Sequence, residues 1–166
     1  MIKFVILVAL FGASGLLGFE ASKVYTLKKQ FFEDILDFTK NIKNEISFLK
    51  TDMLSLLSKY HYKSKLQDIN NQIISEQKTG EILEYEKVKT IVSKIVILKE
   101  SETNTISKMY SELGNLGYLE QIERLEYYIN QYEAMHKSSV DRANKMMPFC
   151  KKMGFLIGSL ICIILI

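Results

Sequence analysis

The stretch GLLGFEASKVYTLKKQFF, residues 15–32, changes from apolar to charged at Glu20 without any residue that would end a helix. Residues 4–19 carry no charge, whereas three lysines follow Glu20 by residue 29. The apolar run is close to the roughly 20 residues that a helix needs to cross about 30 Å of hydrocarbon. The stretch therefore predicts a helix that leaves a membrane near residue 20 and continues into water.

Residues 1–20 also permit a second interpretation, as a secretory signal peptide. Lys3 supplies a basic start, and Ala13-Ser14-Gly15 offers small residues for cleavage. The apolar run continues past that point to Phe19, which favours a retained anchor. We therefore expect residues 1–20 to form an N-terminal transmembrane helix.

The other end of the chain is apolar as well. The run MGFLIGSLICIILI, residues 153–166, spans only about 21 Å as a helix. A start at Phe149 gives about 27 Å, with Lys151 and Lys152 extending toward the lipid headgroups. Pro148 then fits the first turn of the helix, where its missing N–H costs little. A buried core helix is the alternative, but an unbroken apolar run after two lysines favours a C-terminal transmembrane helix over residues 149–166.

Basic residues flank both apolar segments on their inner sides, and this bias predicts the orientation. They are Lys23, Lys28 and Lys29 after the first segment, and Arg142, Lys145, Lys151 and Lys152 before the second. Because cytoplasmic flanks are enriched in lysine and arginine, both segments place residues 21–148 in the cytoplasm.

Small residues recur at a spacing of four in both apolar segments. Ser14 and Gly18 form one such pair, and Gly154 and Gly158 form a G-x-x-x-G pair. This spacing lets helix backbones approach closely in lipid, so the segments can pack on each other or on partner proteins. Ordinary glycine enrichment of membrane helices explains the pattern equally well.

The middle of the chain reads as nearly all helix, because it contains few glycines and Pro148 is the only proline. An apolar stripe of helical period continues from the first segment to about Phe48, and another runs from Ile122 to Met147. Shorter helical patterns lie between them, over residues 51–60, 64–77, 81–98 and 101–113. We predict an all-α antiparallel bundle domain over residues 21–148, with long first and last helices continuous with the two transmembrane segments.

Charge and cysteine content exclude several classes of function. The net charge is +3, and no basic stripe typical of nucleic-acid binding is visible. Cys150 and Cys162 would lie about 18 Å apart along one helix, which is too far for a disulfide. No catalytic, cofactor-binding or metal-binding motif is found, so we expect neither an enzyme nor a cofactor. Glu120, Glu123, Glu126 and Glu133 are interpreted as a solvated helix face that is also suited to a basic partner.

Three segments give the chain a resemblance to a known family. GFEASKVYT at residues 18–26 is similar to a membrane-exit motif, Leu116-Gly117 precedes the last long helix, and KKMGFLIGSLICIILI forms an apolar tail at residues 151–166. In these features the chain resembles the stage III sporulation protein AB family of endospore-forming bacteria, although Glu120 stands where that family commonly has aspartate. The interface candidates are Gly18, Phe19, Glu20, Tyr25, Leu116, Gly117, Glu120, Gly154 and Gly158.

The resemblance implies a role in the channel apparatus that links mother cell and forespore. The family's soluble region is similar to the helical domain of type II secretion F proteins, which form an inner-membrane platform. The implied location is the outer forespore membrane on the mother-cell side. The implied partners are a secretion-type ATPase, stage III sporulation protein AA, and other membrane components of the same operon. Further copies of this chain are an additional candidate partner.

Two other classes of function remain open at this stage. A membrane-tethered sensor or regulator would relay its state by helix shifts instead of building a stable complex. A membrane enzyme would need a polar pocket with a pair of reactive groups, and the sequence indicates no such pair.

Overall fold

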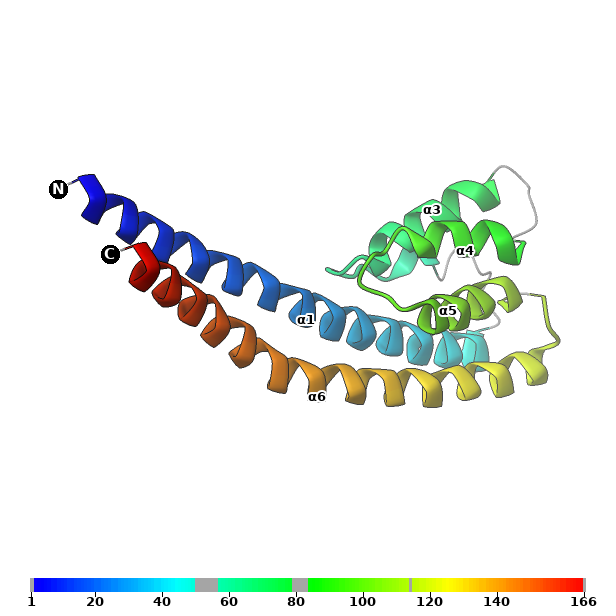
Figure 1. Ribbon diagram of the computed structural model, residues 1–166. Coiled ribbons are helices and arrows are strands. Elements are labelled where there is room, and N and C mark those ends of the chain that lie inside the picture. Colours follow the sequence, from blue (N-terminus) through cyan, green and yellow to red (C-terminus); the bar gives the residue numbers. More distant parts are fainter. Residues whose placement is uncertain (1, 50–56, 79–83, 114, 166) are drawn as a thin grey trace. The chain divides into compact units, whose positions relative to one another are not determined.

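The computed structural model describes residues 2–49, 57–78, 84–113 and 115–165, and the regular elements in these ranges are α-helices. They are α1 (Ile2–Leu49), α3 (Leu66–Lys78), α4 (Tyr85–Ser93), α5 (Glu100–Glu112) and α6 (Tyr118–Leu165) (Figure 1). The predicted all-α fold with long first and last helices is confirmed. Residues 51–56, where the helical pattern predicted over residues 51–60 begins, lie outside the described residues.

Helices α1 and α6 contain 48 residues each, which corresponds to about 72 Å of helix. Each includes one apolar end of the chain, so the predicted continuity of these helices with the apolar segments is confirmed. The prediction for Pro148 was wrong, because this residue lies inside α6 and not in a first turn. A proline within a helix removes the hydrogen bond to the carbonyl four residues earlier, here that of Asn144.

The chain divides into two compact units. The terminal helix pair consists of Met1–Lys29 and Lys137–Ile166, and the helical body consists of Gln30–His136. In the terminal helix pair, the two helices run antiparallel and both ends of the chain lie at the same end of the pair (Figure 1). Both predicted transmembrane segments belong to this unit.

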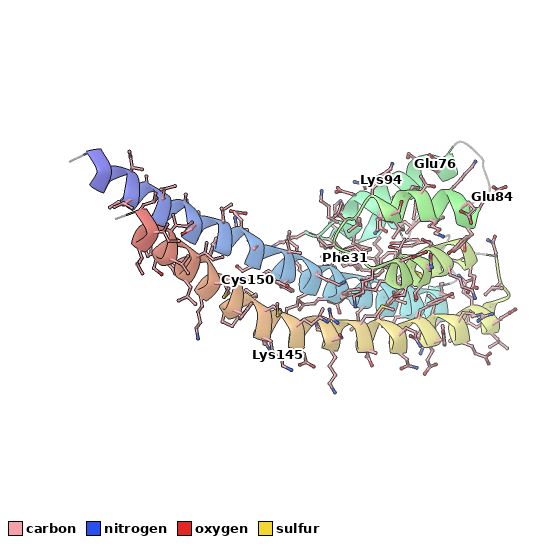
Figure 2. The ribbon with its side chains drawn as sticks, in the orientation of Figure 1. Phe31, Glu76, Glu84, Lys94, Lys145 and Cys150 are labelled. Atoms are coloured by element: carbon pink, nitrogen blue, oxygen red, sulfur yellow. The ribbon has the colours of Figure 1, made fainter. Side chains whose placement is uncertain are left out.

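The core of the helical body is built from one face of each helix. On α1, Phe31, Ile35, Phe38 and Ile42 recur at intervals of three and four and are completely buried. On α6, Leu125, Tyr128, Ile129 and Tyr132 supply the facing stripe. Helix α4 packs against α5 and α3, and all three contribute apolar side chains to the same core. Figure 2 shows Phe31 inside this unit, whereas Glu84 and Lys94 extend from its surface.

Tyrosine and phenylalanine rings form stacked pairs within this core. Phe38 stacks on Tyr110 at 5.8 Å between ring centroids, and Tyr132 stacks on Tyr128 at 6.3 Å. The Tyr110 hydroxyl donates a hydrogen bond to Oδ1 of Asn70, which is also buried. Burial raises the pKa of Tyr110 and Tyr132 well above the usual value, so both rings remain neutral at physiological pH.

The middle helices differ from the sequence prediction at two ends. The pattern over residues 81–98 predicted one helix, but α4 ends at Ser93 and the chain continues in turns. The N–H groups of Lys94, Ile95 and Leu98 each bond to the carbonyl three residues earlier. The β-branched run Ile95–Ile97 disfavours helix, and Ile95 and Ile97 still reach the core. Helix α5 begins at Glu100, where the Glu102 carboxylate accepts a hydrogen bond from the Lys99 N–H at 2.7 Å.

Phe38 tests the importance of the aromatic pairs for stability. Replacement by alanine removes a fully buried ring that contacts Tyr62 and Tyr110. We expect Phe38→Ala to lower the free energy of unfolding by about 3–5 kcal/mol, measured by circular dichroism on the full chain in detergent. Val96, which is 94% exposed, is the control, and Val96→Ala should change this free energy by less than about 0.5 kcal/mol. Equal effects of the two variants would contradict the described core.

Candidate membrane-interface site

The two helices of the terminal helix pair touch at a pair of glycines. A Cβ atom on Gly18 would lie 2.7 Å from the carbonyl oxygen of Cys150 and 2.9 Å from the Cα of Gly154. A Cβ atom on Gly154 would lie 2.8 Å from the carbonyl oxygen of Ser14. Since backbone atoms cannot move aside as a flexible side chain can, only glycine fits at either position while the helices keep this separation.

One turn further along, Ser14 faces Gly158 and Phe155 covers Gly15. A Cβ atom on Gly158 would overlap the Ser14 hydroxyl, and one on Gly15 would approach the Phe155 ring to 3.1 Å. Of the two ways in which the small residues can act, the structure therefore supports packing of the two apolar segments on each other. The Ser14 hydroxyl donates to the Phe11 carbonyl at 2.8 Å, so this polar group is satisfied within its own helix.

The outer surface of the terminal helix pair is apolar. All but four of the large apolar side chains that are exposed among the described residues lie in this unit; the four are Val96, Tyr118, Leu119 and Tyr127. Leu17 and Ile163 are more than 70% exposed. Soluble proteins rarely present so large an apolar surface to water. By length and composition, α1 and α6 each contain a stretch able to cross a membrane. These observations indicate membrane association.

Charged residues gather where the apolar surface ends. Glu20 forms an ion pair with Lys23 at 2.6 Å, one helical turn further along α1. The Phe19 ring lies between two lysines, with Lys23 Nζ at 5.4 Å from its centroid and Lys151 Nζ at 5.1 Å. An aromatic ring beside ammonium groups suits the headgroup region, because the ring is apolar while its face attracts cations. This group of four residues is called the interfacial cluster below.

The structure brings together five of the nine predicted interface residues. Gly18 contacts Gly154, Phe19 and Glu20 belong to the interfacial cluster, and Gly158 faces Ser14. Tyr25 is half-buried on α1, further along the same unit.

The remaining three predicted residues belong to the helical body. Leu116 and Gly117 lie in the connection before α6, and Glu120 lies in the first turn of that helix. Leu116 lines a small pocket with Gln121, Arg124 and Tyr128, while Glu120 is exposed. These three residues therefore belong to a different unit from the interfacial cluster.

The acidic residues of α6 differ in what they contact. Glu133 forms an ion pair with Lys40 of α1 at 2.7 Å, and Glu126 forms one with Lys43 at 3.1 Å. Both carboxylates remain exposed, and the basic groups that they meet are lysines of α1, so they link α6 to α1. Glu120 and Glu123 are exposed on the same helix.

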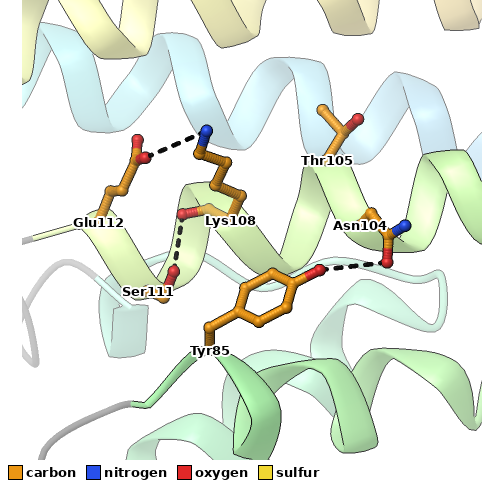
Figure 3. Close-up of a pocket in the computed structure, with 6 residues that line it drawn as sticks. All are labelled: Tyr85, Asn104, Thr105, Lys108, Ser111 and Glu112. Carbon is orange, nitrogen blue, oxygen red and sulfur yellow. Dashed lines mark hydrogen bonds and ion pairs between the residues drawn. The ribbon is translucent and has the colours of Figure 1, made fainter.

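Polar residues line an open pocket of about 480 Å³ between α4 and α5, shown in Figure 3. The Tyr85 hydroxyl donates to Oδ1 of Asn104 at 3.1 Å, and Lys108 lies 3.9 Å from Glu112. The Ser111 hydroxyl donates to the Lys108 main-chain carbonyl and not to the Glu112 carboxylate, the acidic side chain of the lining. Among the lining residues that the structure describes, the hydroxyls of Tyr85, Thr105 and Ser111 donate to an amide or main-chain oxygen, and a nucleophile activated by a base is not formed by these bonds. Within the described ranges, no three histidine, cysteine or acidic residues are grouped to hold a metal ion.

Sequence reasoning placed Lys151 at the lipid headgroups but did not identify its contact with Phe19, nor the contributions of Gly15 and Phe155 to this site. The only available signal was Lys151 itself, at the edge of the apolar tail. Its contact with Phe19 depends on the register between two helices that lie more than 130 positions apart in the chain, which local patterns do not encode.

Comparison with known proteins gives one match. The family model for stage III sporulation protein AB matches residues 3–166. Neither a curated protein nor a solved structure matches the chain significantly.

The glycine contact can be tested by cross-linking. Cys162 Sγ donates to the Leu7 carbonyl oxygen at 3.5 Å, so Leu7→Cys should cross-link to native Cys162 in a Cys150→Ser background. We expect Gly18→Leu to reduce this cross-link strongly, because the new side chain meets backbone atoms of α6. Gly12→Leu is the matched control, since a Cβ atom on Gly12 meets nothing within 4 Å. Equal cross-linking in the two variants, measured on gels of membrane samples, would argue against the contact.

Proposed function

Because the chain belongs to the stage III sporulation protein AB family, we propose that it is a membrane-anchored structural platform of the channel apparatus between mother cell and forespore. In this role it docks a secretion-type ATPase, stage III sporulation protein AA, and contacts other membrane components encoded in the same operon. The proposed location is the outer forespore membrane on the mother-cell side. The family membership supports the sporulation role, and the arguments below support the platform role.

The observation that carries the platform proposal is the continuity of α1 and α6. Each helix runs without a break from an apolar end of the chain into the helical body. A force applied to the body would then reach the membrane through two hydrogen-bonded helices and not through flexible linkers. In the proposed arrangement, residues 1–20 and 149–166 cross the membrane and residues 21–148 face the cytoplasm, as the flanking lysines favour.

The exposed acidic residues of α6 are the proposed contact for the ATPase. Glu126 and Glu133 already pair with lysines of α1. Glu120 and Glu123 extend from the same helix and are exposed, so they are available to a basic surface. Charged residues at the rim of an interface chiefly set the rate and specificity of association. Their reversal should therefore weaken docking without unfolding the helical body.

Charge reversal tests this docking surface. We expect the double variant Glu120→Lys/Glu123→Lys to lower, several-fold, the amount of ATPase that co-purifies with the tagged full chain from sporulating-cell membranes. Sporulation efficiency should fall with it. Glu84→Lys/Glu86→Lys is the matched control, because these residues are equally exposed but precede or begin α4. The control should retain both ATPase binding and sporulation.

Two outcomes would count against the proposal. Loss of binding in both double variants would point to a general charge effect and not to docking on α6. If the unchanged chain recovers no ATPase from membranes, the platform role is wrong. In that case, helix rearrangements that depend on the membrane would favour the regulator described above.

A further inference from the structure

A groove opens on the outer surface of the terminal helix pair, beside the interfacial cluster. It has a volume of about 280 Å³ and is lined by Gly12, Gly15, Leu16, Phe19, Lys151 and Phe155. All of these residues except Lys151 are apolar. Between Gly12 and Phe19 the groove follows about 10 Å of α1, from the interfacial cluster into the apolar segment.

Gly12 keeps this groove open and is not needed for contact between the helices. A Cβ atom on Gly12 would meet no other atom within 4 Å, whereas one on Gly18 would collide with the backbone of α6. The two glycines therefore have different structural effects. Gly18 permits close packing, and the missing side chain of Gly12 leaves space on the lipid-facing side.

One end of the groove carries a positive charge. Glu20 is already paired with Lys23, and Lys151 contacts the Phe19 ring without forming an ion pair with any residue that the structure describes. Lys151 is half-buried, so part of its stem lines the apolar wall while its ammonium group stays near Phe19. An apolar groove that ends at a half-buried ammonium group complements a hydrocarbon chain that ends at an anionic headgroup.

We propose that this groove binds one acyl chain of an anionic phospholipid, whose phosphate contacts Lys151. The inference rests on the membrane insertion of the terminal segments in the proposed function, but not on ATPase docking. Basic pockets between transmembrane helices on the cytoplasmic side are known to suit anionic headgroups. The phosphate would compete with the Phe19 ring for the ammonium group, and the carboxylate of the interfacial cluster, Glu20, is already paired with Lys23.

The lipid preference can be measured on the full chain in nanodiscs of phosphatidylcholine and phosphatidylglycerol in equal amounts. Native mass spectrometry then gives the ratio of the two lipids released with the protein. We expect phosphatidylglycerol to be enriched about fivefold over the bulk, the factor that corresponds to about 1 kcal/mol for one lysine near an anionic lipid. Lys151→Gln should remove this enrichment. Lys152→Gln, the same charge change at the exposed neighbouring position, should retain it.

A second variant separates the groove from the charge. Gly12→Leu fills the open space above α1, so it should reduce the total lipid retained while helix content and the Leu7–Cys162 cross-link stay unchanged. This pattern would support the acyl-chain site even if Lys151→Gln affected stability.

Several results would overturn the proposal. The first is an unchanged chain that retains lipid without preference for phosphatidylglycerol. The second is an equal loss of phosphatidylglycerol enrichment in Lys151→Gln and Lys152→Gln. The third is a Gly12→Leu variant that retains as much total lipid as the unchanged chain. Dimers that Gly12→Leu abolishes, without retained lipid, would assign the groove to a second copy of the chain. Carbonate extraction distinguishes a failure of the proposed function from a failure of the lipid-binding inference alone. A chain that washes off the membrane contradicts the proposed function itself, whereas an inserted chain without bound lipid contradicts only this inference.

Discussion

The close backbone contact between Gly18 and Gly154 fixes the register of the terminal helix pair, and the features of the membrane interface depend on that register. Two antiparallel helices that meet at these glycines bring Ser14 opposite Gly158 one turn deeper. By the same register, Glu20 lies level with the two lysines that precede the apolar tail. A slide that brought Cys150 into the place of Gly154 would put a larger residue at a position where only glycine fits.

This register brings together in space two features that are far apart in the sequence. The apolar run of α1 ends at Glu20, and that of α6 begins after Lys152. Nothing in either segment alone requires these limits to coincide in space. The glycine contact makes them coincide, so the charged residues of both helices lie at one end of a shared apolar surface. A charge at the centre of the hydrocarbon would cost about 2.5–3.5 kcal/mol, whereas a charge at this common limit stays hydrated.

The sequence predicted those features that depend on local pattern. Helical period and the lack of helix breakers sufficed for α1 and α6, and the buried positions Phe31, Phe38 and Tyr132 followed from their spacing. Val24 and Leu27 share that spacing but are exposed, because burial depends on what packs against a face. The pairing of Glu126 and Glu133 with lysines of α1 was missed for the same reason. Long-range contacts depend on register, which a single helix does not contain.

Pro148 bears on where α6 would leave the membrane in the proposed arrangement. Its ring removes the helical hydrogen bond to the Asn144 carbonyl, and in hydrocarbon an unsatisfied carbonyl costs several kcal/mol. At the headgroup level water can satisfy that carbonyl. Pro148 lies three residues before Lys151 and one turn beyond the apolar tail, so its tolerance within a continuous helix is explained if this part of α6 is hydrated. The proline, the lysines and the ion pair of Glu20 with Lys23 thus agree on one boundary, although they reach it through different physical effects: backbone hydrogen bonding, side-chain solvation and charge pairing.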